Sequence, residues 1–165
     1  MTKRKPFDVQ SYVADISTCP CFICELLRGN PQAFHHVLER DDEAVIFLSK
    51  YPTLPGYCLV CPTDHVEDLA EGLTPAAYLR LQAKVHRLSR ALKRIFAAER
   101  IYVLSLGSQQ GNRHLHFHVV PLPPGVPFAE QQFHALMTEN GVLEFSNDEM
   151  ARMASDIRAA YRALD

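Results

Sequence analysis

The amino-acid sequence predicts an α+β fold, in which an antiparallel sheet packs against one long central helix and further C-terminal helices. Several short apolar runs are bounded by turn-forming residues, which is typical of strands. One long segment carries apolar residues mainly at three- and four-residue spacing, which is typical of an amphipathic helix. No strand–helix–strand unit repeats along the chain, and this favours an antiparallel sheet over a parallel one.

The strands are expected in two pairs. Residues 44–48 and 56–61 are apolar and flank a proline-containing turn at residues 52–55, which indicates a hairpin with a wide loop. Two further apolar runs, at residues 101–104 and 115–120, are expected to add two more strands.

The long helix is expected at residues 75–98. Thr74 can cap its N-terminus, and Pro75 suits the first helical position, where an amide hydrogen is not needed. Its apolar stripe consists of Leu79, Leu81, Val85, Leu88, Leu92, Ile95 and Phe96.

The two ends of the chain differ in character. A cluster of prolines after residue 120 is expected to end the sheet, and residues 128–140 and 147–164 are expected to be helical. Residues 1–18 are polar with weak periodicity, so they indicate an N-terminal extension that packs against the domain or stays mobile. Residues 19–165 are expected to form a single domain, because a chain of 165 residues fits one core.

Charge and composition exclude several classes of protein. The formal net charge is -2, which argues against the broad basic surface that DNA or RNA binding needs. No apolar run approaches the roughly 18 residues of a membrane span, and the N-terminus lacks the apolar core of a signal peptide. The five cysteines include a Cys-x-x-Cys pair, which in an intracellular protein favours metal or redox chemistry over disulfides. A cytoplasmic location is therefore expected.

Three histidines alternate with apolar residues near the middle of the chain. Side chains alternate across a strand, so His114, His116 and His118 are expected on one face, successive ones about 7 Å apart. A histidine is close to its pKa at neutral pH and attacks phosphorus as the neutral base, so one of the three can be a nucleophile while the others orient it and manage protons. A surface face that carries histidines by chance is the alternative. The glycine-bounded loop at residues 107–112 could supply backbone amides to a phosphate, although such loops are also common as plain connections.

Three segments of the chain resemble the histidine triad (HIT) superfamily of nucleotide hydrolases and transferases. Residues 114–120 match its His-φ-His-φ-His-φ-φ motif, where φ is apolar. Residues 21–26 are similar to its N-terminal zinc motif, and residues 55–65 are similar to its Gly-His-x-Leu-Val-x-Pro-x-x-His segment. The resemblance implies the HIT-like fold, with an antiparallel sheet of about five strands, and a homodimer in which long helices and edge strands meet.

The same resemblance implies the roles of the catalytic residues. His116 would be the nucleophile that forms a nucleotidyl-histidine intermediate, and His118 would hydrogen-bond the phosphate. His114 completes the catalytic triad, and Asn112 would lie near the leaving group.

The nucleotide-binding residues also follow from the resemblance. Phe47 and Leu48 would line the base pocket, Ser49 would meet the ribose hydroxyls, and Ser105 would lie in the phosphate region. The chain departs from the family pattern at Tyr57, where the histidine of the Gly-His pair is usual. It also departs at Ser49, where other members carry Asp or Asn, and at Leu122, where many members carry an arginine.

A zinc site is expected at the Cys-x-x-Cys pair. Cys21 and Cys24 provide the closely spaced thiolates with which such a site begins. The resemblance adds His65 and His114 as the other two ligands of a structural zinc ion. The alternative is a redox pair, for which the thioredoxin-like βαβ context is missing.

The remaining cysteines and histidines are not expected to act in a site. Cys58 and Cys61 would point to opposite faces of a strand as buried apolar residues. His35 and His36 are expected to be solvated turn residues. His86 and His134 are expected on helix surfaces or in packing.

The resemblance implies an enzyme that cleaves a nucleoside 5′-phosphoryl bond, with a dinucleoside polyphosphate such as diadenosine polyphosphate as its substrate. Residues 148–158 resemble the last helix of the dinucleoside triphosphate hydrolase branch, whereas the missing arginine at Leu122 favours another leaving group. A purine nucleoside phosphoramidase of the same fold is one alternative. The other is a protein that binds or senses nucleotides without turnover.

Overall fold

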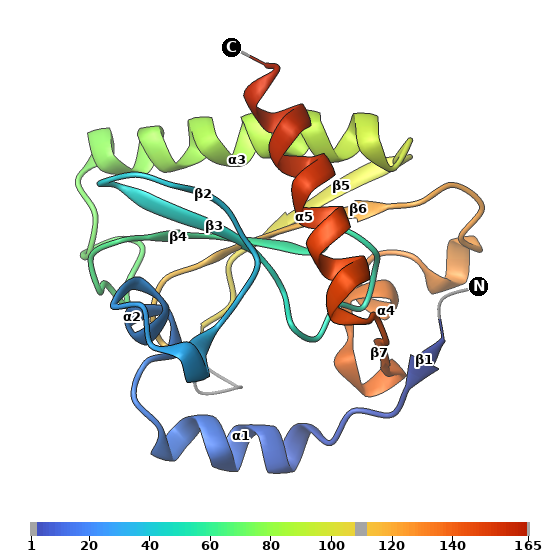
Figure 1. Cartoon of the computed structure of the whole chain (residues 1–165), viewed down its shortest axis with the longest axis horizontal. Coiled ribbons are helices and arrows are strands. Elements are labelled where there is room, and N and C mark those ends of the chain that lie inside the picture. Colours follow the sequence, from blue (N-terminus) through green and yellow to red (C-terminus); the bar gives the residue numbers. More distant parts are fainter. Residues whose placement is uncertain (1–2, 108–111, 165) are drawn as a thin grey trace.

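A computed structural model describes residues 3–107 and 112–164 and confirms the α+β class (Figure 1). Its centre is a five-stranded antiparallel sheet in the order β2-β3-β4-β6-β5. The strands are β2 (Val37–Arg40), β3 (Ala44–Leu48), β4 (Cys58–Pro62), β5 (Arg100–Leu104) and β6 (Phe117–Leu122). A second small sheet pairs β1 (Arg4–Lys5), close to the N-terminus, with β7 (Val142–Leu143).

Within residues 3–107 and 112–164, five α-helices and three short 3₁₀ turns accompany the central sheet. The helices are α1 (Val9–Thr18), α2 (Phe22–Leu27), α3 (Pro75–Ile95), α4 (Phe133–Leu136) and α5 (Asn147–Arg162). The 3₁₀ turns are η1 (Pro31–Ala33), η2 (Phe128–Glu130) and η3 (Thr138–Asn140). No helix within the described ranges has both the length and the apolar character that a bilayer span requires.

The long helix α3 begins where the sequence predicted. The Thr74 side chain accepts a hydrogen bond from the amide of Ala77, and Pro75 occupies the first turn. The helix ends at Ile95, three residues before the predicted end, and Ala97 follows with a positive φ of 46°. The left-handed conformation of Ala97 turns the chain out of the helix and towards β5.

One face of the sheet is covered by α3 and α5 (Figure 1). Leu88 and Leu92 of α3 are fully buried against alternate residues of the strands, such as Val60 and Val119. The other face is covered by α2 and α4 at separate places. Between these two covered areas, this second face carries the histidine strand β6.

Helix α5 is fastened at both ends. Ser146 and Glu149 form a reciprocal capping box at its N-terminus. Near its C-terminus, the Arg158 guanidinium donates to the carbonyl oxygen of Val37 at 2.6 Å. The Arg87 guanidinium of α3 also lies 4.4 Å from the ring centre of Tyr161.

The prediction of one helix at residues 128–140 is wrong. The structure divides this segment into η2, α4 and η3, and α4 is only four residues long. The break coincides with Gln132, whose φ of 56° lies in the left-handed region and is incompatible with a continuous helix. The amide of Gln132 instead donates to the Tyr102 hydroxyl at 3.0 Å.

Strand β6 also extends beyond its predicted end at residue 120. It continues through Pro121 to Leu122, opposite Arg100 and Ile101 of β5. Pairing of β6 with β4 stops at Val119, so Pro121 has a neighbouring strand on one side only. Proline has no amide hydrogen, and it is tolerated there because one side of its backbone forms no hydrogen bonds to a neighbouring strand.

Candidate functional site

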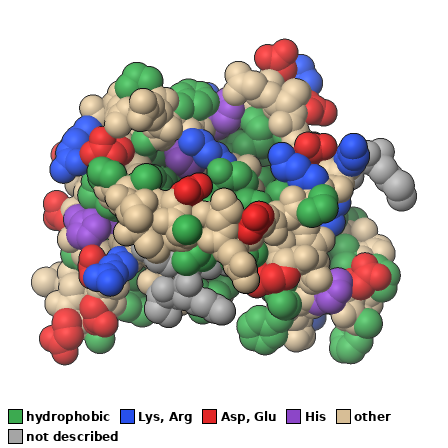
Figure 2. Space-filling view, turned by 90° about the horizontal axis from the view of Figure 1, so that it is seen from below, with side chains coloured by type: hydrophobic (Ala, Val, Ile, Leu, Met, Phe, Trp, Pro, Cys, Tyr) green, Lys and Arg blue, Asp and Glu red, His purple; other side chains and the backbone are tan. Residues whose placement is uncertain are grey.

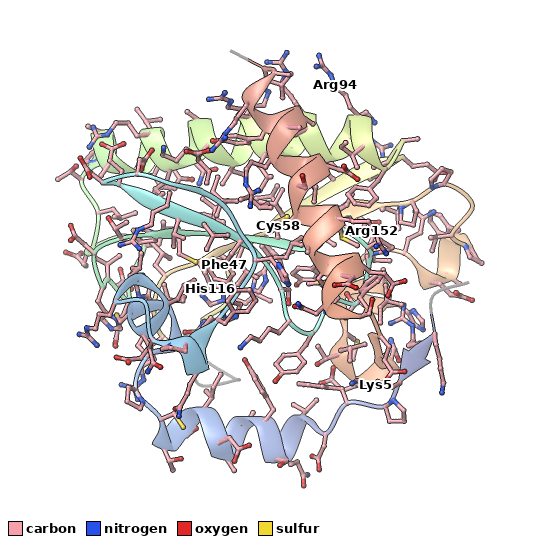
Figure 3. The ribbon with its side chains drawn as sticks, in the orientation of Figure 1. Lys5, Phe47, Cys58, Arg94, His116 and Arg152 are labelled. Carbon is pink, nitrogen blue, oxygen red and sulfur yellow. The ribbon has the colours of Figure 1, made fainter. Side chains whose placement is uncertain are left out.

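The three histidines of the motif enter the site from the start of β6. His114 is fully buried, His116 is 5% exposed and His118 is partly buried. The rings of His116 and His118 meet edge to face, with their centres 4.7 Å apart. The intervening Leu115, Phe117 and Val119 belong to the core under α3, as strand alternation requires. Figure 3 shows His116 on the side of the sheet that is directed towards α1 and α2.

His116 is held in one tautomer by the backbone. Its Nδ1 atom lies 2.7 Å from the carbonyl oxygen of His114. A carbonyl oxygen can only accept, so Nδ1 carries the hydrogen and Nε2 keeps its lone pair. Burial lowers the pKa of His116, which favours the neutral ring. The arrangement leaves Nε2 available as a nucleophile.

Two further polar side chains lie close to His116. The Ser105 hydroxyl donates to the backbone carbonyl of His116 at 2.9 Å, so Ser105 fixes the strand and does not reach the ring. The Asn112 side-chain nitrogen approaches Nδ1 of His116 to 3.5 Å. Residues 108–111 of the glycine-bounded loop lie outside the described residues.

His118 is paired with Tyr57, the residue that stands in place of the histidine of the Gly-His pair. The Tyr57 hydroxyl lies 3.1 Å from Nδ1 of His118. Burial lowers the pKa of His118 to about 3 and raises the pKa of Tyr57, so both groups are neutral. Because a phenol is a stronger acid than a neutral imidazole, the hydroxyl donates to Nδ1. The hydrogen of the ring is then on Nε2, which makes His118 a donor at that atom.

A cavity of about 540 Å³ opens next to this pair of histidines, a volume typical of small-molecule sites. Four of the residues that were expected to bind a nucleotide line it, namely Phe47, Ser49, Asn112 and His118. The described lining does not include His116 or Ser105, although the His116 ring contacts that of His118.

Leu48 does not lie at this cavity, which corrects the expectation that it lines the base pocket. It is 2% exposed and packs in the core on the α3 side of the sheet. Phe47 belongs to the cluster on the opposite face. Consecutive residues of a strand point to opposite faces, so only one of the two can face the cavity.

His35 is part of the cavity wall, which corrects the expectation of a solvated turn residue. Its ring stacks on Phe22 with a centre distance of 5.2 Å and meets the edge of Phe47 at 4.9 Å. Its Nδ1 atom lies 2.8 Å from the carbonyl oxygen of Ala33. Burial lowers the pKa of His35 to about 4, so the ring is neutral at physiological pH. Its aromatic partners come from distant parts of the chain, and no local sequence pattern identified them.

Two cysteines and two histidines gather beside the triad. The donor atoms of Cys21, Cys24, His65 and His114 all lie within 4.8 Å of one another. The His65 Nδ1 atom is 3.2 Å from the Cys24 sulfur, and the His114 Nδ1 atom is 3.5 Å from the Cys21 sulfur. Tetrahedral zinc with ordinary bond lengths separates such ligands by about 3.5 Å. The set therefore fits zinc in ligand type, number and spacing.

The outer ring atoms of the two histidines also fit a metal site. His114 Nε2 lies 2.9 Å from the carbonyl oxygen of Pro62, and His65 Nε2 lies 3.2 Å from a Glu67 carboxylate oxygen. Because both of these oxygens are acceptors, the hydrogens lie on Nε2 and the Nδ1 atoms are free to bind a metal. Cys58 and Cys61 are buried on opposite faces of β4, as expected of apolar fillers.

Comparison with known proteins identifies the family. The HIT domain family matches residues 30–124. An uncharacterized HIT-like protein of Saccharolobus solfataricus is 32% identical over 104 residues, which cover 61% of this chain and 73% of the relative. The solved structure of a hypothetical histidine triad nucleotide-binding protein from Sulfolobus tokodaii has a TM-score of 0.70 at 22% identity, over 87% of this chain and 93% of that chain. A Zn-bound histidine triad family protein from Mycobacterium smegmatis has a TM-score of 0.67 at 22% identity, over 88% and 95%. With its motif, its fold and this match, the chain belongs to the HIT domain family.

Proposed function

We propose that the protein is a nucleotide hydrolase or transferase that cleaves a nucleoside 5′-phosphoryl bond through covalent attack by His116. The observation that carries this proposal is the hydrogen bond from His116 Nδ1 to the His114 carbonyl oxygen, which leaves Nε2 unprotonated. An unprotonated, desolvated imidazole nitrogen is an effective nucleophile towards phosphorus.

The reaction would proceed in two displacements. In the first, Nε2 of His116 forms a bond to the α-phosphorus while the bond to the leaving group breaks, and the leaving group takes up a proton. In the second, water or another acceptor attacks the phosphorus, the phosphorus–nitrogen bond breaks, and a proton is released. His118 would donate its Nε2 hydrogen to a phosphate oxygen and stabilise the charge that develops there.

The cavity supports a nucleotide as the ligand. Phe47 and His35 provide planar apolar surface of the kind that a base contacts. Ser49 also lines the cavity and would meet the ribose, although a hydroxyl is a weaker acceptor than a carboxylate. The Sulfolobus tokodaii protein of similar fold is described as nucleotide-binding.

A dinucleoside polyphosphate is the substrate that we favour. Lys50 lines the cavity and could pair with a polyphosphate leaving group. The second candidate is a purine nucleoside phosphoramidate, and it is favoured by Leu122. That side chain is fully buried in an apolar cluster, so its position gives the leaving group no cationic partner.

We also propose that Cys21, Cys24, His65 and His114 hold a structural zinc ion. Zinc would supply no chemistry to the reaction, because all four of its ligands would come from the protein. It would fix His114, and the His114 carbonyl in turn orients His116. The Mycobacterium smegmatis protein of similar fold is described as Zn-bound.

A symmetric homodimer is part of the proposal. Strand β5 is an edge strand, and its Val103 is 46% exposed. On α3, Leu79 and Ile95 are 65% and 41% exposed. Pairing of two copies through α3 and β5 would bury these side chains. Figure 2 shows the face that carries α1, where lysine and arginine side chains lie at separate places among acidic and apolar ones.

The experiment that tests the reaction uses purified protein and a panel of adenosine and guanosine polyphosphates and phosphoramidates. Turnover should occur with at least one member, and His116→Ala should lower kcat at least about a thousandfold, since covalent catalysis needs that nitrogen. His116→Ala should still bind a nucleoside monophosphate, and His118→Ala should be impaired less completely. With a substrate labelled on its α-phosphate, quenching without acid should trap the label on His116.

The matched control is His134→Ala, which removes an exposed imidazole outside the site and should retain wild-type turnover. Wild-type activity in His116→Ala, or label on another residue, would show that the mechanism is wrong. Nucleotide binding without any turnover in the wild type would instead support the sensing alternative.

A further inference from the structure

The helix α1 presents one face to the cavity. Four of its residues or immediate neighbours line it, namely Tyr12, Asp15, Ile16 and Cys19. Their spacing of three, four and seven residues places them along one side of a helix. No residue of α1 is buried. The inner face of α1 therefore borders the cavity instead of packing into a core.

Aromatic contacts hold α1 in this position. Phe7, Tyr12 and Tyr51 form a mutual cluster, with ring centres 4.9 to 5.4 Å apart. All three rings line the cavity. Burial raises the pKa of Tyr12 to about 12, as expected for a ring at a water-poor boundary. Strand β1 precedes this cluster and is anchored to β7, so the segment before α1 is tied down as well.

The opposite wall of the same cavity is also aromatic. Phe22, His35 and Phe47 form the second cluster, on the side of the sheet and α2. The polar groups that a sugar and a phosphate need, on Ser49, Asn112 and His118, line the same cavity. Planar apolar surface from these two clusters, in one cavity with polar groups that include the triad histidine His118, suits a flat base attached to a sugar phosphate.

The α1 side of the cavity, apart from Tyr51, lies outside the part of the chain that the HIT domain family matches. The match begins at residue 30, whereas Phe7, Tyr12 and Ile16 precede it. We infer that α1 is a substrate-recognition element, in which Tyr12 and Ile16 close the cavity over the base of a bound nucleotide. The inference rests on the proposed function in one respect, namely that the ligand is a nucleotide.

The test compares two ligands that differ only in the base. Wild-type protein should bind AMP more tightly than ribose 5-phosphate in calorimetric titrations. In Tyr12→Ala the affinity for AMP should fall about fivefold to a hundredfold, since this is the range for a lost base–aromatic contact. The affinity for ribose 5-phosphate should stay unchanged. Tyr12→Ala combined with Ile16→Ala should bring the two ligands close to equal affinity, whereas Tyr12→Phe should keep the preference for AMP because it keeps the ring.

Val13→Ala is the matched control, because Val13 is a partly buried apolar residue of α1 that does not line the cavity. It should leave both affinities at wild-type values, and circular dichroism should show that every variant is folded at the temperature of the titrations. An unchanged preference for AMP in the double variant would overturn the inference and leave the catalytic proposal intact. Equal affinity of the wild type for both ligands would overturn it as well. Base-dependent binding that depends on Tyr12 but is accompanied by no turnover would support the inference and refute the proposed catalysis.

Discussion

Two neighbouring imidazoles in this protein are held in opposite tautomers by different partners. The His114 carbonyl places the hydrogen of His116 on Nδ1, whereas the Tyr57 hydroxyl places that of His118 on Nε2. One ring thereby offers a lone pair at Nε2 and the other offers a hydrogen at the same atom. The Tyr57 hydroxyl acts through one side-chain hydrogen bond, so a single substitution can test it.

Tyr57→Phe removes the hydrogen bond to His118 and keeps the ring in place. We expect kcat to fall about tenfold while KM changes much less, because His118 loses the partner that fixes its tautomer. Tyr57→His should restore part of the loss by offering a ring nitrogen at the same place. Tyr51→Phe is the control, since Tyr51 lines the same cavity and contacts its neighbours through its ring. Wild-type kcat in Tyr57→Phe would refute this positioning role.

The buried imidazole of His35 should make stability depend on pH. Its pKa is lowered from 6.5 to about 4 in the folded protein, so between these pH values the unfolded chain binds a proton that the folded chain does not. The free energy of unfolding should therefore fall as the pH falls through this window, by up to about 1.4 kcal/mol per pH unit. His35→Leu should flatten the dependence, measured by urea unfolding at several pH values. The same slope in the variant and the wild type would contradict the assignment. His118, whose pKa is lowered to about 3, should leave a residual slope in both.

At the level of elements, the Cys/His cluster brings together residues that lie far apart in the sequence. Cys21 occupies the N-cap position of the six-residue helix α2, without a capping hydrogen bond from its side chain, and Cys24 lies within the helix. His65 follows β4, and His114 precedes β6. Within α2 only Ile23 is buried. A helix this short has little stability of its own, so its order depends on what fastens it to the sheet.

Removal of zinc should therefore loosen α2 before it loosens the sheet. We expect about one zinc ion per chain by elemental analysis, and its loss in Cys21→Ser or His65→Ala because an incomplete ligand set binds weakly. Amide hydrogen exchange at residues 22–27 should then accelerate more than about tenfold, while the centre of α3 stays protected. Cys19→Ser is the control, because Cys19 is an exposed neighbour outside the cluster. Chelator-free protein without zinc would remove the metal proposal and leave the triad untouched.

For the whole molecule, the exposed apolar side chains of α3 and β5 predict self-association. Sedimentation at micromolar concentration should give the mass of two 18.7 kDa chains. Leu79→Lys combined with Val103→Lys should give single chains, because two buried charges per subunit would face each other across the twofold axis. Phe128→Lys is the control, since Phe128 is 88% exposed and lies outside both elements. A wild-type mass of one chain would contradict the dimer.

The sequence by itself determined those features that follow from a regular spacing of apolar residues along one strand or helix. The alternation of residues 114–120 placed the histidines on one face and Phe117 in the core, and the apolar stripe with its Thr74 cap defined α3. The resemblance of short motifs to the HIT superfamily identified the family and named the four residues of the Cys/His cluster. The same strand alternation already excludes Phe47 and Leu48 from one pocket, so the error at Leu48 was avoidable.

Only the tertiary structure decided what surrounds the histidines. The cavity brings Tyr12 and Tyr51 to the wall opposite His35, and the fold sets the Tyr57 hydroxyl against His118. These contacts join residues that are far apart in the chain, and no local pattern of hydrophobicity or turn residues records them. The break at Gln132 has the same origin, because its amide bonds to the hydroxyl of Tyr102 on another element. A periodic sequence fixes which face of an element is apolar, but the identity of the facing residue depends on how the elements pack.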